Sequence, residues 1–370
     1  MINLETPKKF RALIDQAHQV AENVLRPISR KYDLAEHTYP KELDMLAAMI
    51  DGLEESGQSG GAGAAGVKGD PSTNGSGGGN RNGSNLSTVL SIIEMCWGDV
   101  GLTLALPRQG LGNAAIASVA TPEQQERFAG KWAAMAITEP EAGSDSAAIR
   151  TTAVLDGDEY VLNGEKIFVT SGDRADLLVV WATLDPSKGR AAIKSFVVDR
   201  HAPGVKLDRL EHKLGIRASD TANFVLENVR VPKENLLGSP EIDTKKSFAG
   251  AMKTFDNTRP LVAAMALGVA RACIERTREL LAEAGVEVDY DRPATAQSGP
   301  AAELLDMEAD YEAALLITLE AAWMADNSKP NSLHASMAKA KAARTAVDIA
   351  MRCVELCGAT GYGEDELLEK

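Results

Sequence analysis

Three short segments combine hydroxyl-bearing side chains with tight-turn residues, and they are the parts of the sequence best suited to chemistry. They are residues 137–145 (ITEPEAGSD), 168–172 (FVTSG) and 255–260 (FDNTRP). Hydroxyl groups both donate and accept hydrogen bonds, and Gly, Pro, Asn and Asp favour tight turns. We therefore expect the reactive site of the protein to be built from these three segments.

The cysteines do not predict a metal site. They are Cys96, Cys273, Cys353 and Cys357. The last two are four residues apart and would share one face of a helix, but no histidine or second cysteine pair has the spacing of a zinc site. We expect small apolar packing residues in a reducing compartment and no bound metal.

The elements that must position the three segments follow from the pattern along the chain. Residues 1–130 are expected to form a mostly helical domain, in which Thr121-Pro-Glu-Gln predicts a helix start with Thr121 as N-cap. A stretch at 56–86, dominated by Gly, Ser and Asn, cannot offset its ordering entropy, so we expect a flexible surface insertion rather than a phosphate-binding loop. Apolar residues recur at helical spacing near the start of the chain: Phe10, Leu13, Ile14, Ala17, Val20 and Val24.

Residues 131–240 are expected to form a β domain. From residue 150 onward, β-branched runs alternate with turn signals, and the pattern predicts short antiparallel strands rather than a βαβ repeat. Two dipeptides, Asp156-Gly157 and Asn163-Gly164, predict turns, the second a two-residue hairpin turn. A dinucleotide-binding βαβ unit is therefore disfavoured.

Residues 241–370 are expected to form a second helical domain, from Ala-rich segments at 260–285, 301–326 and 333–357. The fold class is thus α+β, with a β domain between two helical ones. Because pockets favour domain junctions, we expect the cleft where the β domain meets the helices.

Charge and hydropathy narrow the possible partners. The formal net charge is -14, from 39 basic and 53 acidic residues, which argues against binding to nucleic acid. No apolar run reaches the roughly 18 residues needed to span a membrane, and the N-terminus lacks the apolar core of a secretion signal. We expect a cytoplasmic protein.

Five stretches resemble the acyl-CoA dehydrogenase family, from about residue 10 to the end of the chain apart from the glycine-rich insertion. They are residues 136–145 (AITEPEAGSD), 162–172 (LNGEKIFVTSG), 213–220 (KLGIRASD), 229–238 (VRVPKENLLG) and 255–260 (FDNTRP). The resemblance implies that family's fold, with a C-terminal domain like a four-helix bundle. It also implies an FAD-dependent enzyme of fatty acid β-oxidation that converts an acyl-CoA to a trans-2-enoyl-CoA and passes electrons to an electron-transfer flavoprotein.

The resemblance also implies roles for individual residues. Those implied for FAD binding are Ile137, Thr138, Gly143, Ser144, Phe168, Val169 and Thr170. Those implied for the substrate side are Ser144, Asp256, Thr258 and Arg259. Structural roles are the alternatives: Thr138 or Ser144 could simply fold a turn, Phe168 could be strand core, and Thr258 could be an N-cap before Pro260.

The resemblance does not supply the catalytic base. In most of the family it is a glutamate in a C-terminal motif, which we expect in a tail beyond Lys370. Some relatives place it on the first C-terminal helix instead, where this chain has Thr258. The carboxylates of Glu364, Glu366 and Glu369 are interpreted as solvated tail charges.

Two further departures concern a neighbouring subunit's FAD. The family's Arg-x-x-Phe-Gly motif is replaced by acidic residues in 284–293, and its Gln-x-x-Gly-Gly-x-Gly loop reads ELCGATG at 355–361. Because a carboxylate repels a pyrophosphate, we expect a hetero-oligomer with a homologous acyl-CoA dehydrogenase subunit, α2β2 in composition. A non-catalytic structural subunit and an acyl-CoA oxidase are the alternatives.

Overall fold

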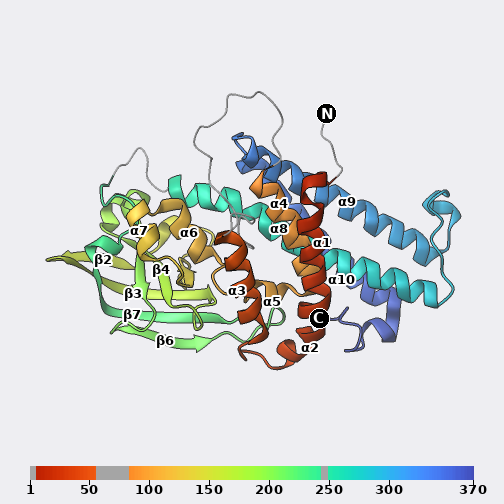
Figure 1. Ribbon diagram of the computed structural model, residues 1–370, viewed down its shortest axis with the longest axis horizontal. Helices are drawn as coiled ribbons and strands as arrows, with labels where there is room; N and C mark the ends of the chain where they lie inside the picture. The colour runs from red at the N-terminus through yellow and green to blue at the C-terminus, as the bar shows by residue number, and fades with distance from the viewer. Residues whose placement is uncertain (1–5, 56–82, 243–248) are drawn as a thin grey trace. The chain divides into compact units, whose positions relative to one another are not determined.

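The computed structural model describes residues 6–55, 83–242 and 249–370, so most of the predicted flexible insertion lies outside the described residues (Figure 1). The chain divides into two compact units. Of the described residues, one unit comprises 6–34, 83–103 and 256–370, and the other comprises 35–55, 104–242 and 249–255.

The first unit is helical. Its central contacts are those of α1 with α4, α4 with α9, and α9 with α10. Gly268 of α8 lies directly against α4, where an added Cβ atom would come within 2.5 Å of the Ile93 carbonyl oxygen, so this helix pair needs a residue without a side chain. The helices that fall wholly or largely in this unit are α1 (Arg11–Val20), a π-helical turn (Ala21–Leu25), α2 (Arg26–Leu34), α4 (Ser84–Gly98), α5 (Val100–Leu104), α8 (Ala249–Glu283), α9 (Gly299–Asp326) and α10 (Ser332–Gly361).

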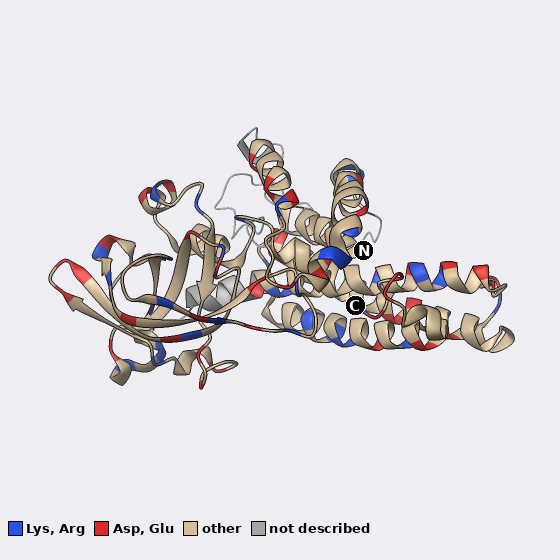
Figure 2. Ribbon diagram, turned by 90° about the horizontal axis from the view of Figure 1, so that it is seen from below, with Lys and Arg blue, Asp and Glu red and all other residues tan. Residues whose placement is uncertain are grey.

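Charged residues of both signs are interspersed along the long C-terminal helices of this unit (Figure 2). Two of the resulting ion pairs join α9 to α10: Lys341 with Asp310 at 2.8 Å, and Arg352 with Asp306 at 2.9 Å. Among the described residues, none of the helices has the length and apolar composition required to cross a membrane.

The second unit is built on a seven-stranded sheet with the order β1-β4-β2-β3-β7-β6, in which β5 also pairs with β4. Pairings are antiparallel except those of β4 with β1 and with β2, which are parallel. The strands are β1 (Ala133–Ala136), β2 (Thr152–Asp156), β3 (Glu159–Thr170), β4 (Leu177–Thr183), β5 (Ile193–Asp199), β6 (Val205–Leu210) and β7 (Thr221–Pro232), and the unit also holds α3 (Glu42–Glu55), α6 (Leu111–Val119) and α7 (Pro122–Arg127).

Every residue of β4 is buried, because side chains cover both faces of that strand. One face belongs to the main core of the sheet, with Phe196 and Phe224 fully buried. On the other face α6 packs against β1 and β4. Gly112 permits this approach, since an added Cβ atom there would lie 2.2 Å from the Ala133 carbonyl oxygen.

The order of helical, β and helical segments confirms the predicted fold class. Thr121 also forms the predicted helix start, a full capping box in which its side chain accepts from the Gln124 N–H. Asp156-Gly157 forms the predicted turn between β2 and β3, with Gly157 at φ 65°.

The predicted hairpin turn at Asn163-Gly164 is wrong. Both residues lie inside β3, where the register with β7 shifts between Leu162 and Gly164. The glycine is required for close packing instead, because a Cβ atom at Gly164 would lie 2.4 Å from the Thr151 hydroxyl oxygen. Strand β1 lies before residue 150, where the sequence pattern predicted the first of the strands.

The end of the predicted insertion also needs correction. Ser84, Asn85 and Leu86 begin α4, and the last two are buried. The Asp326 carboxylate accepts hydrogen bonds from the Gly83, Asn85 and Leu86 N–H groups at 2.8–3.0 Å, so an acidic residue distant in sequence caps this helix.

Candidate functional site

The two segments implied for flavin binding lie side by side in the sheet unit. The first, 137–145, follows β1, and the second, 168–172, ends β3. The Ile167 N–H donates a 2.9 Å hydrogen bond to the Thr138 carbonyl oxygen, which joins the two directly. All seven residues implied for FAD binding therefore belong to one compact unit.

A buried ion pair holds these segments together. Lys166 is fully buried, and its ammonium donates to the Ile137 carbonyl oxygen at 3.1 Å and to the Glu139 carboxylate at 2.7 Å. That carboxylate also accepts from the Arg150 N–H at 2.6 Å and from both the N–H and the hydroxyl of Thr151. Sequence reasoning assigned no role to this pair, although a charged residue at an inward-facing strand position is a signal that could have found it.

The charges of the pair follow from its surroundings. Burial opposes ionisation of Glu139, but the Lys166 ammonium and the hydrogen bonds to Thr151 and Arg150 hold the pKa of this carboxyl below its usual value. For Lys166, burial outweighs the attraction of Glu139 and lowers the pKa of the ammonium to about 8. Both groups are therefore charged at neutral pH.

Phe168 is presented to solvent by an irregularity in β3. The register with β7 shifts between Lys166 and Val169, Phe168 takes a left-handed backbone at φ 57°, and its N–H donates to the Asn223 side-chain oxygen at 3.1 Å. Its side chain is 58% exposed, so the alternative of a strand-core phenylalanine is wrong. Val169 is fully buried in the sheet core, which leaves its backbone as the part able to meet a ligand.

The hydroxyl groups of the two joined segments are open to a ligand. Ser144 and Thr170 are exposed, Thr138 is half-buried, and within the described residues none of the three side chains forms a hydrogen bond. The turn in the first segment is closed instead by backbone hydrogen bonds between Glu139 and Ala142. This arrangement disfavours purely turn-forming roles for Thr138 and Ser144.

An exposed aromatic ring and exposed hydroxyls on two joined segments fit the flavin that the sequence resemblance implies. Gly143 adds open space in the first segment, since an added Cβ atom there would meet no atom of the described residues within 4 Å. Flavin rings have apolar faces and a polar edge, and these residues offer a complement to both.

Three of the four residues implied for the substrate side lie in the other unit, within α8, and only Ser144 lies in the sheet unit. Arg259 forms an ion pair with Asp256 at 2.5 Å, and the same carboxylate oxygen accepts from the Ser332 hydroxyl at 3.0 Å. Thr258 is buried inside α8, which begins at Ala249, so its alternative role as an N-cap is wrong. Their placement beside the flavin residues stays a prediction.

The residues that replace the family's subunit-bridging motifs are partly exposed. Glu355 is exposed on α10, and this helix is kinked at Gly358, which has φ 56°. Glu366 and Glu369 are not solvated tail charges as expected, because they pair at 2.5 Å with Arg276 and Arg30.

Comparison with known proteins matches most of the chain to three family models. Residues 7–136 match the acyl-CoA dehydrogenase N-terminal domain, residues 134–229 the middle domain, and residues 248–370 the C-terminal domain. The short-chain-specific acyl-CoA dehydrogenase of Clostridium acetobutylicum is 35% identical over 300 residues, which cover 79% of this chain and 77% of that protein.

A second relative and a solved structure are also similar to this chain. The caffeyl-CoA reductase–Etf complex subunit CarC of Acetobacterium woodii is 34% identical over 300 residues, covering 79% of this chain and 77% of the relative. The butyryl-CoA dehydrogenase structure from Megasphaera elsdenii superposes with a TM-score of 0.80 at 28% identity, covering 100% of this chain and 94% of that one.

Proposed function

Because this chain belongs to the acyl-CoA dehydrogenase family, we propose that it carries out FAD-dependent α,β-dehydrogenation of an acyl-CoA thioester to a trans-2-enoyl-CoA and passes the electrons to an electron-transfer flavoprotein. Enzymes of this family are oxidoreductases that act on CH–CH groups, and they bind FAD. The observation that carries the proposal is the exposed Phe168 ring, held by a strand irregularity, together with the exposed hydroxyls of Ser144 and Thr170, which form no hydrogen bond among the described residues.

When bound, FAD supplies a hydride acceptor for the substrate β-carbon. Phe168 would pack against the flavin, and Thr170 and Thr138 would hydrogen-bond to its polar edge. The buried Lys166–Glu139 pair fixes the two segments that carry these groups, so they are positioned before a ligand arrives.

Removal of the α-proton requires a carboxylate base held away from water. Thr258 carries no carboxylate, and it occupies the position that some relatives use for the base. The residues described would therefore serve flavin and substrate binding.

The electron acceptor and the partner subunit are supported by different observations. Similarity to a subunit of a caffeyl-CoA reductase–Etf complex supports an electron-transfer flavoprotein as partner. The exposed Glu355 carboxylate, at a position where the family has glutamine, supports an α2β2 assembly in which a homologous subunit supplies the missing Arg and Gln. Substituting that partner's arginine should empty the flavin site, and unchanged flavin occupancy would argue against the hetero-oligomer.

Reduction of an enoyl-CoA is the second candidate, because a relative 34% identical to this chain is named a reductase. The same residues would serve both directions, and the relative potentials of substrate and electron carrier would set the direction. Turnover assayed with acyl-CoA plus an oxidant and with enoyl-CoA plus a reductant distinguishes the two.

Substitution of the flavin-contacting residues tests the proposed site. Thr170→Val and Ser144→Ala should each weaken FAD binding by about 0.5–1.5 kcal/mol, which is the usual worth of one hydrogen bond. Phe168→Ala should weaken it as well, whereas Phe168→Trp should not, because an aromatic face is kept. FAD dissociation constants measured by fluorescence titration give the result.

Ser187→Ala is the matched control, since Ser187 carries an exposed hydroxyl in the same unit that bonds, among the described residues, only to Asp185. If all four site variants bind FAD with the same affinity as the Ser187→Ala control, the flavin binds elsewhere.

A further inference from the structure

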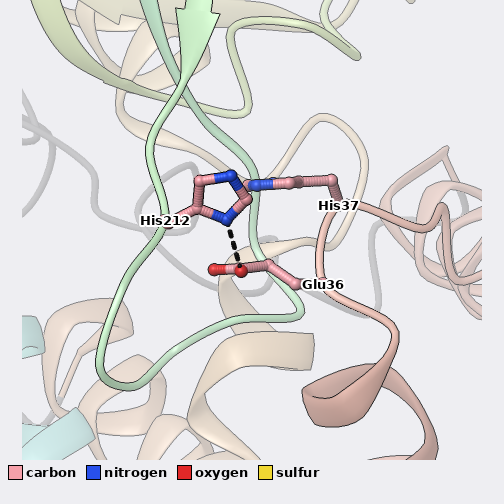
Figure 3. Close-up of side chains that lie close together, drawn as sticks. All are labelled: Glu36, His37 and His212. Atoms are coloured by element: carbon pink, nitrogen blue, oxygen red, sulfur yellow. Dashed lines mark hydrogen bonds and ion pairs between the residues drawn. The ribbon is translucent and has the colours of Figure 1, made fainter.

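Three side chains with metal-binding atoms come together in the sheet unit, and none of them is among the residues assigned to flavin or substrate. Glu36 and His37 follow the end of α2, and His212 follows β6 (Figure 3). The nitrogen and oxygen atoms that they could offer to a metal all lie within 4.8 Å of one another. Sequence spacing predicted no metal site because these residues are far apart along the chain.

The two rings and the carboxylate converge on one point. His212 Nδ1 lies 2.9 Å from a Glu36 carboxylate oxygen, and the rings of His37 and His212 meet edge to face with centroids 5.1 Å apart (Figure 3). The His212 side chain is 84% exposed, so its ring has room to rotate toward an ion.

His37 is the residue that points most directly to a missing ligand. Both of its ring nitrogens are buried and lack a hydrogen-bond partner among the described residues. A buried polar atom without a partner costs free energy, and such a group in a native protein calls for an explanation. His37 also holds a left-handed backbone at φ 67°, a conformation that is uncommon outside glycine and is found at functional sites.

The Glu36 carboxylate is already oriented. It accepts a 3.0 Å hydrogen bond from the Lys213 N–H through one oxygen, and its side chain is 9% exposed. Hydrogen bonds of this kind orient the ligands of metal sites. The Arg217 guanidinium lies 3.5 Å from the other oxygen and would have to swing away when a cation binds, which its 33% exposure allows.

We propose that Glu36, His37 and His212 bind one divalent transition-metal ion of the zinc type. Two imidazoles and one carboxylate form a ligand set that suits Zn²⁺, Ni²⁺ or Cu²⁺ and not Mg²⁺ or Ca²⁺. Water would complete a tetrahedral site, with ligand bonds of about 2.0–2.2 Å after the exposed His212 ring moves inward.

Such an ion would fasten the chain segment after α2 to residues 211–220. That second segment supports the candidate flavin site, because the Asp220 carbonyl oxygen accepts a 2.9 Å hydrogen bond from the Ser171 N–H. The ion would therefore have a structural role, linking two segments of the chain, and the proposal does not depend on the activity proposed above.

The test is a zinc titration of the untagged full-length protein after chelator treatment, in which binding is measured by calorimetry. We expect one equivalent of Zn²⁺ to bind, and His212→Ala and His37→Asn each to weaken binding at least about tenfold. Asparagine is chosen at position 37 because it tolerates a left-handed backbone. The control is His201→Ala, which removes an exposed histidine of the same unit.

A second measurement is independent of calorimetry. Zn²⁺ should raise the melting temperature of the unmodified protein and of the His201→Ala variant, and should leave that of His212→Ala unchanged, because only a ligand that binds the folded state stabilises it. Zinc binding as tight in His212→Ala as in the unmodified protein, or no binding in the unmodified protein, would overturn the proposal.

Discussion

At the scale of single residues, the buried pair of Lys166 and Glu139 is the feature on which the candidate flavin site depends. The two side chains join the end of β1, the middle of β3 and the start of β2 through one set of hydrogen bonds. Exposed ion pairs of the same unit, such as Lys206 with Glu227, join only neighbouring strands. Burial thus distinguishes this pair, which holds the segments of the site together, from exposed pairs, which contribute little to stability.

Substitution of Lys166 by methionine should be strongly destabilising. Methionine fills similar space but leaves the Glu139 charge buried without its partner, and removing one member of a buried pair costs about 3–5 kcal/mol. A denaturant titration followed by circular dichroism measures the loss. Lys206→Met removes a partner from the exposed pair and should change the midpoint little; equal midpoints for both variants would contradict the role of the buried pair.

The same lysine predicts a pH dependence. Its pKa of about 8 in the folded chain lies below the 10.5 of an unperturbed lysine, so between these values the folded chain binds fewer protons than the unfolded chain. Stability therefore rises with pH across this window. Between pH 8 and 10.5, the denaturant midpoint of the unmodified protein should rise relative to that of Lys166→Met. If the two midpoints change with pH in parallel, the low pKa of Lys166 is refuted.

At the scale of elements, α4 depends on a cap from another helix. The Asp326 carboxylate at the end of α9 bonds three N–H groups at the start of α4, and a side chain at Gly83 would collide with it. This contact fixes α4 against α9 within the helical unit.

Asp326→Ala should therefore cost about 0.5–2 kcal/mol, the usual worth of an N-cap. Faster hydrogen exchange of the Gly83, Asn85 and Leu86 amides is the direct readout. Asp310→Ala, which removes an exposed acidic residue of the same helix, serves as control. Unchanged exchange in Asp326→Ala would show that the cap contributes nothing.

Elements set by local signals were predictable from sequence, and elements set by distant contacts were not. Thr121 has its capping partner three residues away, and Asp156-Gly157 turns between two adjacent strands, so both features could be read locally. Asn163-Gly164 carries the same kind of turn signal, but there the glycine serves close packing against Thr151. Strand β1 consists of four residues, AAMA, with no β-branched side chain, so its sequence does not indicate a strand. It forms a strand because it pairs with the buried β4.

In the candidate site, too, features carried by local sequence motifs could be predicted and features set by distant contacts could not. Motif residues such as Ser144 and Phe168 could be identified by resemblance, and the structure adds the exposure of the ring and its positive φ. The supports of the site were missed because Lys166, Asn223 and Asp220 act through contacts between segments. Residue type alone does not reveal such partners.

At the scale of the whole molecule, the residues implied for flavin belong to one compact unit and Asp256, Thr258 and Arg259 to the other. Each unit has its own buried core, so each can hold its residues in place independently. We therefore expect that FAD binding responds to substitutions at Phe168 and Thr170, while acyl-CoA affinity responds to substitution at Arg259.

The most direct test of the proposed reaction is the visible spectrum of the purified full-length protein, recorded without oxygen before and after addition of saturated acyl-CoA thioesters of several lengths. If the chain is colourless when expressed alone, the complex with its homologous subunit is used. The proposed function predicts a yellow protein whose flavin band bleaches as enoyl-CoA forms in equal amount. A flavin-loaded protein that keeps its band with every saturated acyl-CoA, and forms no enoyl-CoA, would contradict acyl-CoA dehydrogenation.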